Sequence, residues 1–372
     1  MLNVVLHITR TVALQLILSF SILVIFLSPG FKNFGVSEVD YDNKLSSKMD
    51  FESISIDTSS TPAPNLTTTG ANDVKAVVEK AVVIMFDRAY DSQFTNAKPI
   101  LDKYGFKASF FVICSFVEGS GYHKLSNGSE LKSGSTNALN WDQIRQLYEE
   151  GHDIQSHGME HRDLRQLSLE ALEFEIGGSK ECLENNGVKP AFFQYPSNKG
   201  GDNATVLKMV SNFYDFGLAG HSTLMFLSCD GWVNHGFETR SYKYQQDCNP
   251  INSEGKLTRT HKYAIREWSH DREHTSLNEK NPQLTPHGMQ MSDLMFNEFV
   301  NIVEAQNQYN SKAGKIVAVP IIGYHQIHNT SSYDTSVELF DREMKYLYDN
   351  GYNVLKLTDL SYNNTGNHFY IK

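Results

Sequence analysis

A pair of histidines four residues apart is the first candidate for chemistry in this sequence. The run at residues 156–161 reads Ser-His-Gly-Met-Glu-His and follows a short strand-like segment. If the chain turns helically there, the rings of His157 and His161 can reach one metal ion. This spacing alone is common on solvent-facing segments, so the hypothesis depends on further polar residues nearby.

Other polar residues follow apolar runs at three places. Asp87 comes directly after the apolar run 82–86, Gln194 lies within the run 191–195, and His325 follows the run 316–324. An aspartate in that place often caps a helix. The recurrence of polar side chains at strand ends beside a histidine pair nevertheless indicates a shared site.

Short strand-like runs alternate with amphipathic helical segments from residue 74 onward. This alternation indicates parallel βα units, and therefore an α/β barrel or an open sheet. In both folds functional residues lie at the carboxyl ends of the strands. The predicted strands are residues 82–86, 108–113, 153–156, 191–195, 316–324 and 352–357, and the predicted helices are 96–104, 141–150, 167–185, 204–213, 294–309 and 337–349.

Residues 221–286 interrupt this alternation. The segment is polar and longer than ordinary loops between elements. We expect an irregular insertion there, within one domain that spans residues 74–372.

The sequence resembles the polysaccharide deacetylase family, also called the NodB-homology family or carbohydrate esterase family 4. Phe86-Asp87 and the run 103–112 resemble the start of that domain, residues 151–161 its second motif and Tyr195-Pro196 its third. Tyr324-His325 resembles the fifth motif, and residues 344–355 resemble the final helix and strand. The match spans roughly residues 74–360, and its order is more specific than any single motif.

The resemblance implies a distorted (β/α) barrel and a metal-dependent hydrolase that removes acyl groups from an amino sugar of a polysaccharide or oligosaccharide. It implies a divalent metal, usually zinc, held by His157 and His161. It implies Asp87 as the base that takes a proton from water, and His325 as the acid that protonates the leaving amine. By the same resemblance the backbone N–H of Ser197 helps to hold the oxyanion, while Tyr195 and Pro196 shape the acyl pocket.

Two positions depart from the family pattern. Arg88 stands where the family has a metal-ligating acid, and Gln194 stands where it often has an arginine that steers the base. A guanidinium cannot ligate zinc and repels it. We therefore predict that Arg88 points at the site, forms an ion pair with Asp87 or another carboxylate, and weakens metal binding. Arg266 to Trp268 is the candidate for the family's fourth motif, and it lies inside the long insertion.

Three interpretations remain open. The first is an active deacetylase whose third ligand is Asp91, Asp153 or water. The second is a metal-free or weakly metallated hydrolase of altered chemistry. The third is a non-catalytic relative that binds glycan. A membrane-anchored adhesin without an active site fits the N-terminal sequence but leaves the four retained motif residues unexplained.

Composition limits the partners. Lys and Arg number 33 against 43 Asp and Glu, which gives a net charge of -10, and no long basic run occurs. Nucleic acid is therefore not expected as a partner, because phosphate binding needs clustered basic residues.

The N-terminus predicts an exported, membrane-attached protein. Arg10 precedes the apolar stretch 12–27, and no small-x-small cleavage motif follows it. We expect residues 1–30 to be a transmembrane signal anchor, with a cleaved signal peptide as the alternative. Residues 31–73 are polar and should form a flexible stalk that places the domain outside the cytoplasm. Five glycosylation sequons fit this location, at Asn65, Asn127, Asn203, Asn329 and Asn363.

Four cysteines occur, and none makes a CxxC pair. A structural zinc cluster is therefore not expected. Cys229 and Cys248 flank one polar stretch, where they either form a disulfide or remain free thiols.

Overall fold

The structure is a computed structural model that describes residues 80–118, 120–124, 130–228, 261–271, 291–328 and 334–372. These residues belong to one compact unit, Asn72–Lys372. The predicted anchor, the predicted stalk, Cys229 and Cys248 lie outside the described residues.

Seven parallel strands close into a barrel. The sheet order is β11-β9-β7-β6-β5-β2-β1, and β1 pairs with β11 to complete the ring. An eighth strand, β12, pairs with the first half of β1. The predicted (β/α) barrel is therefore confirmed. The strands are β1 (Lys80–Phe86), β2 (Ser109–Val112), β5 (Asp153–Ser156), β6 (Phe192–Gln194), β7 (Phe216–His221), β9 (Ile265–Ser269), β11 (Ile321–Tyr324) and β12 (Tyr352–Leu355).

The first strand shows why the strands read as continuous apolar runs. Val82, Ile84 and Phe86 pack into the layer between the barrel and its helices. Ala81, Val83 and Met85 pack into a second cluster with residues from other strands. A parallel strand buried on both faces needs apolar residues at every position, which is the pattern of this segment.

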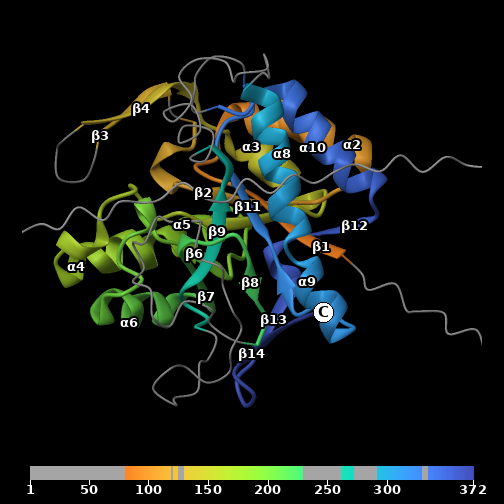
Figure 1. Cartoon of the computed structure of the whole chain (residues 1–372). Coiled ribbons are helices and arrows are strands. Elements are labelled where there is room, and N and C mark those ends of the chain that lie inside the picture. Colours follow the sequence, from red (N-terminus) through yellow and green to blue (C-terminus); the bar gives the residue numbers. More distant parts are fainter. Residues whose placement is uncertain (1–79, 119, 125–129, 229–260, 272–290, 329–333) are drawn as a thin grey trace, which may run out of the picture. The chain divides into compact units, whose positions relative to one another are not determined.

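Helices cover the outside of the barrel (Figure 1). Helix α10 packs against α2 and α8, while α4 and α6 pack near the π-helical turn Phe174–Gly178. The helices are α2 (Lys98–Tyr104), α3 (Trp141–Glu149), α4 (Leu169–Glu173), α5 (Ser179–Asn185), α6 (Ala204–Phe213), α8 (Met291–Glu304), α9 (Asn307–Ala313) and α10 (Val337–Asp349).

Helix α10 has the clearest local signals. Ser336 caps its first turn by accepting a hydrogen bond from the Leu339 backbone N–H, and apolar residues recur on one face. Phe340 from that face meets the rings of Phe86 and Tyr324 at centroid distances of 5.7 and 5.1 Å. Such a capped, amphipathic segment is readable from sequence alone.

Three predicted elements require correction. The predicted helix 294–309 is two helices, α8 and α9. The predicted strand 316–324 is two strands, β10 (Ala318–Val319) and β11, because Pro320 lacks the N–H that a continuous ladder needs. The segment 221–286 is not wholly irregular, since it contains β8 (Met225–Phe226) and the barrel strand β9.

Two hairpins and one disulfide were not predicted. The hairpins are β3 (Ser120–Lys124) with β4 (Glu130–Asn137), and β13 (Leu360–Asn363) with β14 (His368–Ile371). The disulfide joins Cys114, in the 3₁₀ turn Cys114–Phe116, to Cys182 in α5.

Core packing on α10 predicts a large cost of truncation. Leu347 is fully buried, whereas Leu169 at the start of α4 is 64% exposed. Leu347→Ala should lower the free energy of unfolding by about 2–5 kcal/mol, because it removes buried methyl groups and leaves a cavity. Leu169→Ala should change it by less than about 0.5 kcal/mol. Urea denaturation of both variants measures the difference, and equal losses would contradict this packing.

Candidate active site

One cavity of about 320 Å³ lies at the carboxyl ends of the barrel strands. Parallel strands place those ends at the same mouth, so residues distant in sequence meet there. Each residue ends a strand or lies in the loop after it, except Glu267, which lies within β9. The lining residues are Asp87, Arg88, His157, His161, Gln194, Tyr195, Ser197, Asn198, His221, Glu267, Ser269 and His325.

The two histidines of the predicted pair lie together, with ring centroids 4.7 Å apart and nearly perpendicular planes. Nδ1 of His157 lies 3.1 Å from the backbone oxygen of Gln194, which accepts its hydrogen bond when Nδ1 carries the proton. That tautomer leaves Nε2 of His157 with a lone pair. Nε2 of His161 is buried and has no hydrogen-bond partner.

Both rings favour the neutral form. Burial, followed by the charges of His161 and Arg88, holds the pKa of His157 well below its usual value. Burial and then the Arg88 guanidinium lower the pKa of His161 to about 3. A neutral imidazole with an available Nε2 is the form that ligates metals.

Two buried carboxyl groups share an amide. Gln194 Nε2 donates to Oδ2 of Asp87 at 3.0 Å and lies 3.4 Å from Oε1 of Glu267. Burial raises the pKa of Asp87, while the charge of His325 and the bond from Gln194 oppose it. Burial and the Asp87 charge raise the pKa of Glu267 well above its usual value. Like charges this close cannot both ionise easily, so the two carboxyl groups disfavour a second negative charge on the pair.

His325 is fixed by a carboxylate from the strand beside it. Asp271 Oδ2 accepts from the His325 backbone N–H at 2.6 Å and lies 3.0 Å from its Nδ1. This places the Nδ1 proton on the Asp271 side, so Nε2 is the atom that exchanges protons with the cavity. Nε2 lies 3.5 Å from Oδ2 of Asp87.

A buried polar chain continues behind Asp271. The Thr335 hydroxyl donates to Oδ1 of Asp271 at 2.8 Å and lies 3.0 Å from Nδ1 of His270. Nε2 of His270 lies 2.7 Å from Glu343, whose other oxygen accepts from the Tyr324 hydroxyl at 2.8 Å. Each polar side chain in this hydrogen-bonded series therefore has a partner, and the series holds the His325 ring in a fixed orientation.

Arg88 lies at the cavity, as predicted, but without the predicted ion pair. Its Nη1 donates to the Tyr90 hydroxyl at 3.5 Å, and no described carboxylate oxygen lies within 4 Å of the guanidinium. Arg88 and Ala89 both have left-handed backbone conformations, with φ of 68° and 51°. Such conformations are costly for residues with a Cβ and occur where surrounding structure enforces them.

The site fits a metal only in part. His157 and His161 supply two neutral nitrogen ligands, but a catalytic zinc usually has three protein ligands. Neither aspartate that the sequence suggested as a third ligand is available. Asp153 begins β5 at the opposite end of the barrel, where it accepts hydrogen bonds from Thr358. Asp91 accepts from Gln143 and does not line the cavity.

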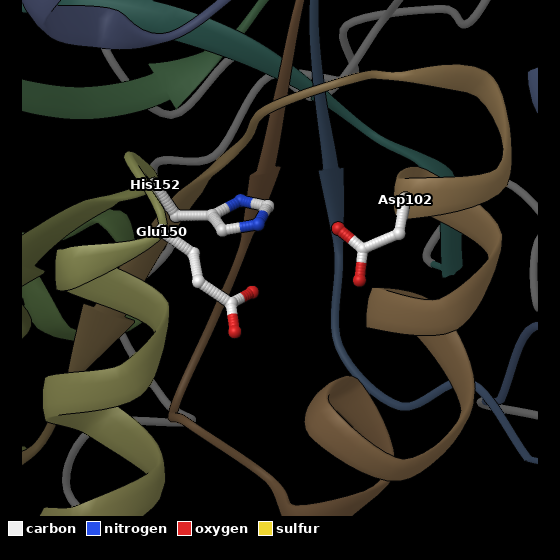
Figure 2. A group of neighbouring side chains, drawn as sticks. All are labelled: Asp102, Glu150 and His152. Carbon is white, nitrogen blue, oxygen red and sulfur yellow. The ribbon is translucent and has the colours of Figure 1, made fainter.

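A second group of possible metal ligands lies at the amino end of β5. Figure 2 shows Asp102, Glu150 and His152, whose ligand atoms lie within 4.8 Å of one another. Lys98 already bridges the two carboxylates, at 2.6 and 2.5 Å. His152 Nδ1 accepts a hydrogen bond from the Ala108 backbone N–H, so the ring proton is on Nε2. A metal ion would need Nε2 without that proton. The geometry therefore favours a lysine-bridged network there.

Of the two predicted acyl-pocket residues and the predicted oxyanion residue Ser197, one does not line the cavity. Tyr195 and Ser197 line the cavity, and Ser197 has a left-handed backbone with φ of 56°. Pro196 is buried and does not line it.

Sequence reasoning missed Asp271 and gave no role to Glu267, although residues 266–268 were noted as a candidate fourth motif. Both come from β9 and its end, inside the stretch that the sequence predicted to be irregular. The signal was present in the short run Ile-Arg-Glu-Trp-Ser-His-Asp at residues 265–271, in which acidic residues follow a strand-like core.

The fold and the cavity define an α/β-barrel protein with paired histidines and buried carboxyl groups at the carboxyl end of the barrel. Residues 75–213 match the family model of polysaccharide deacetylases. The predicted resemblance to that family is therefore confirmed.

Known relatives are similar over parts of the chain. YxkH of Bacillus subtilis (strain 168), which carries a polysaccharide deacetylase name, is 30% identical over 107 residues, 29% of this chain; the match spans about a third (33%) of that relative. The deacetylase PplD of Streptococcus pyogenes is 26% identical over 38% of this chain and 56% of its own, with a TM-score of 0.32. A structure described as T48 deacetylase with substrate is 16% identical over 75% of this chain and 89% of its own, with a TM-score of 0.40.

The buried ring of His152 predicts a pH effect on stability. Burial and the nearby Lys107 charge lower its pKa from 6.5 to about 4. Between those values the unfolded chain binds a proton that the folded chain does not. The stabilisation is therefore complete above pH 6.5 and is lost as the pH falls, by about 1.4 kcal/mol per pH unit. The free energy of unfolding is measured by urea denaturation between pH 7 and pH 4.5. Its dependence on pH should be shallower by that amount in His152→Gln than in the wild type. If the pH dependence of the free energy of unfolding is the same in both proteins, His152 is not held in its neutral form by burial.

Proposed function

We propose that this protein is a metal-dependent hydrolase that removes acetyl groups from N-acetylated amino sugars of a cell-surface or extracellular polysaccharide. The observation that supports this most is the meeting of Asp87, His157, His161 and His325 in one cavity. The match of residues 75–213 to the polysaccharide deacetylase family supports the same reaction.

His157 and His161 would hold the divalent cation, with zinc the expected metal. Such an ion polarises an acyl carbonyl and lowers the pKa of bound water. The remaining coordination positions would be filled by water or substrate, because Arg88 takes the place of a carboxylate. Two-histidine coordination is weaker than three-ligand coordination, so we expect this chain to bind zinc less tightly than a site with a third protein ligand.

The protonation states assign the acid and the base. Asp87, ionised beside Gln194, would take a proton from the attacking water. His325 Nε2 would give a proton to the departing amine, since Asp271 holds its Nδ1 and stabilises the charged ring. Asp87 Oδ2 and His325 Nε2 lie 3.5 Å apart. Both groups could therefore act on the same amide bond of a bound substrate.

A non-catalytic glycan-binding relative is the second candidate. It is favoured by the guanidinium at a ligand position and by the missing third ligand. This alternative would be established if the purified protein contains no zinc, binds chito-oligosaccharide, and does not hydrolyse it at any concentration of added zinc.

Arg88 determines the strength of metal binding in this proposal. Arg88→Asp changes the local charge by about two units and adds a ligand, which at an effective dielectric near 20 is worth a few kcal/mol. We expect zinc affinity to rise at least tenfold and deacetylation of an N-acetylated oligosaccharide to increase. Zinc affinity is measured by competition with a chromophoric chelator, and acetate release measures activity.

Two variants separate charge from ligation. Arg88→Gln removes the charge without adding a ligand and should give an intermediate affinity, while Arg145→Gln on exposed α3 should change nothing. If Arg88→Asp leaves affinity and activity unchanged while His157→Ala abolishes both, the guanidinium does not oppose the metal.

We further propose that residues 1–30 anchor the protein in a membrane, with the domain outside the cytoplasm. No helix within the described residues is long and apolar enough to cross a membrane, and residues 1–30 lie outside them. Arg10 before the apolar stretch favours an inward amino terminus. Alkaline carbonate washing should leave the full-length protein in the membrane fraction. Release into the supernatant, or a mature chain that begins near residue 31, would refute the anchor.

A further inference from the structure

The loop between the two histidines is held by a buried glutamate. Glu175 Oε2 accepts hydrogen bonds from the backbone N–H groups of Met159 at 3.0 Å and Glu160 at 2.9 Å. The Glu175 backbone oxygen accepts from the same Met159 N–H at 3.1 Å. Residues 159 and 160 lie directly between His157 and His161, so this carboxylate sets the path of the chain from one ring to the other.

Glu175 is buried with backbone N–H groups, rather than a cation, as its partners. Its side chain is fully buried, and no described Lys, Arg or His nitrogen lies within 4 Å of it. Burial raises its pKa to about 7, so its ionised form is held at a cost. A buried carboxyl group that lies beside a cavity and contacts the backbone between cavity residues is a candidate for a functional role.

The surrounding structure is built to present this side chain. Glu175 lies in the π-helical turn Phe174–Gly178, an irregularity that often marks functional sites. A Cβ on Gly177 would come within 2.6 Å of the Phe213 ring, and a Cβ on Gly158 within 3.0 Å of Glu175 Oε2. Gly158 also has a left-handed φ of 87°. Gly158 therefore allows the histidine loop to approach the π-helical turn closely, and Gly177 allows the same turn to approach Phe213 at the end of α6.

The opposite side of the loop is held as well. The backbone N–H groups of Cys114 and Ser115 donate to the carbonyls of Gly158 and Met159, at 3.1 and 3.0 Å. The disulfide to Cys182 then links this 3₁₀ turn to α5, which directly follows the π-helical turn. The loop is thus held between two elements that are covalently joined.

We propose that Glu175 is a positioning residue for the candidate metal site: its carboxylate holds the backbone between His157 and His161 so that both rings address one ion. This inference rests on the proposed function, because it concerns the same site. Glu175 touches neither the metal nor the substrate and acts through the orientation of the two rings.

The test measures zinc affinity of the full-length chain by chelator competition. Glu175→Ala should weaken zinc binding about 10–100-fold, the usual effect of losing a group that orients metal ligands. Glu175→Gln keeps one acceptor oxygen and should restore affinity to within about threefold of the wild type, since that oxygen can accept both N–H groups. The exposed neighbour on α4 provides the matched controls Glu173→Gln and Glu173→Ala, which should change nothing.

A second variant tests the same contact without removing the carboxylate. Gly158→Ala places a methyl group against Glu175 Oε2 and should also weaken zinc binding. In the double variant with Glu175→Ala its effect should shrink, because the obstructed oxygen is gone. Additive losses would indicate independent damage and contradict the proposal. Should Glu175→Ala fail to fold, Glu175→Met, which keeps the length of the side chain without an acceptor oxygen, replaces it and should show the same loss; unchanged affinity in that variant contradicts the proposal.

The outcomes separate this inference from the proposed function. If His157→Ala and His161→Ala leave zinc affinity unchanged, the metal site itself is wrong. If those variants lose zinc while Glu175→Ala binds it as tightly as the wild type, the site stands and Glu175 is not a positioning residue. Circular dichroism and urea denaturation at the same temperature verify that each variant is folded.

Discussion

Closure of the parallel sheet is the constraint on which the rest of the structure depends. Because β1 pairs with both β2 and β11, seven strand ends are forced around one mouth. Four cavity residues come from four different strand ends: Asp87, His157, Gln194 and His325. No two of them are close in sequence. The cavity exists only because the ring is closed.

Charge balance within this mouth explains the unusual composition of the site. A buried aspartate and a buried glutamate face a neutral amide, Gln194, rather than a cation. The positive charge lies instead on Arg88, next to the two histidines, whose pKa values it lowers. The Arg88 charge acts on the two histidines and also on Asp87, whose pKa it lowers against the effect of burial. Burial lowers the pKa values of both rings most, and the Arg88 charge, which would also disfavour a metal ion there, adds to that effect.

Rigidity comes from buried polar groups outside the cavity. His325 is held by Asp271, and behind it lies a chain that reaches Glu343 on α10 and Tyr324 on β11. The histidine loop is held by Glu175 on one side and by the turn at Cys114 on the other. In both cases a reactive ring is oriented by a carboxylate that solvent does not reach. Two separate supports therefore fix His325 and the histidine pair independently.

The sequence by itself determined the barrel class, most helices and the four motif residues of the cavity. These depend on local signals: continuous apolar runs for strands buried on both faces, capped amphipathic segments such as α10, and polar residues directly after strands. The tertiary structure alone decided which acids face the site. Asp153 and Glu267 are both acids of short strands, yet one begins β5 at the far end and the other lies within β9 at the mouth. Strand direction and register separate them, and neither is encoded in a short window of sequence. The same holds for Cys114 with Cys182 and for Glu175 with its loop, because partners 68 and 15 residues apart meet only after the helices have packed on the barrel.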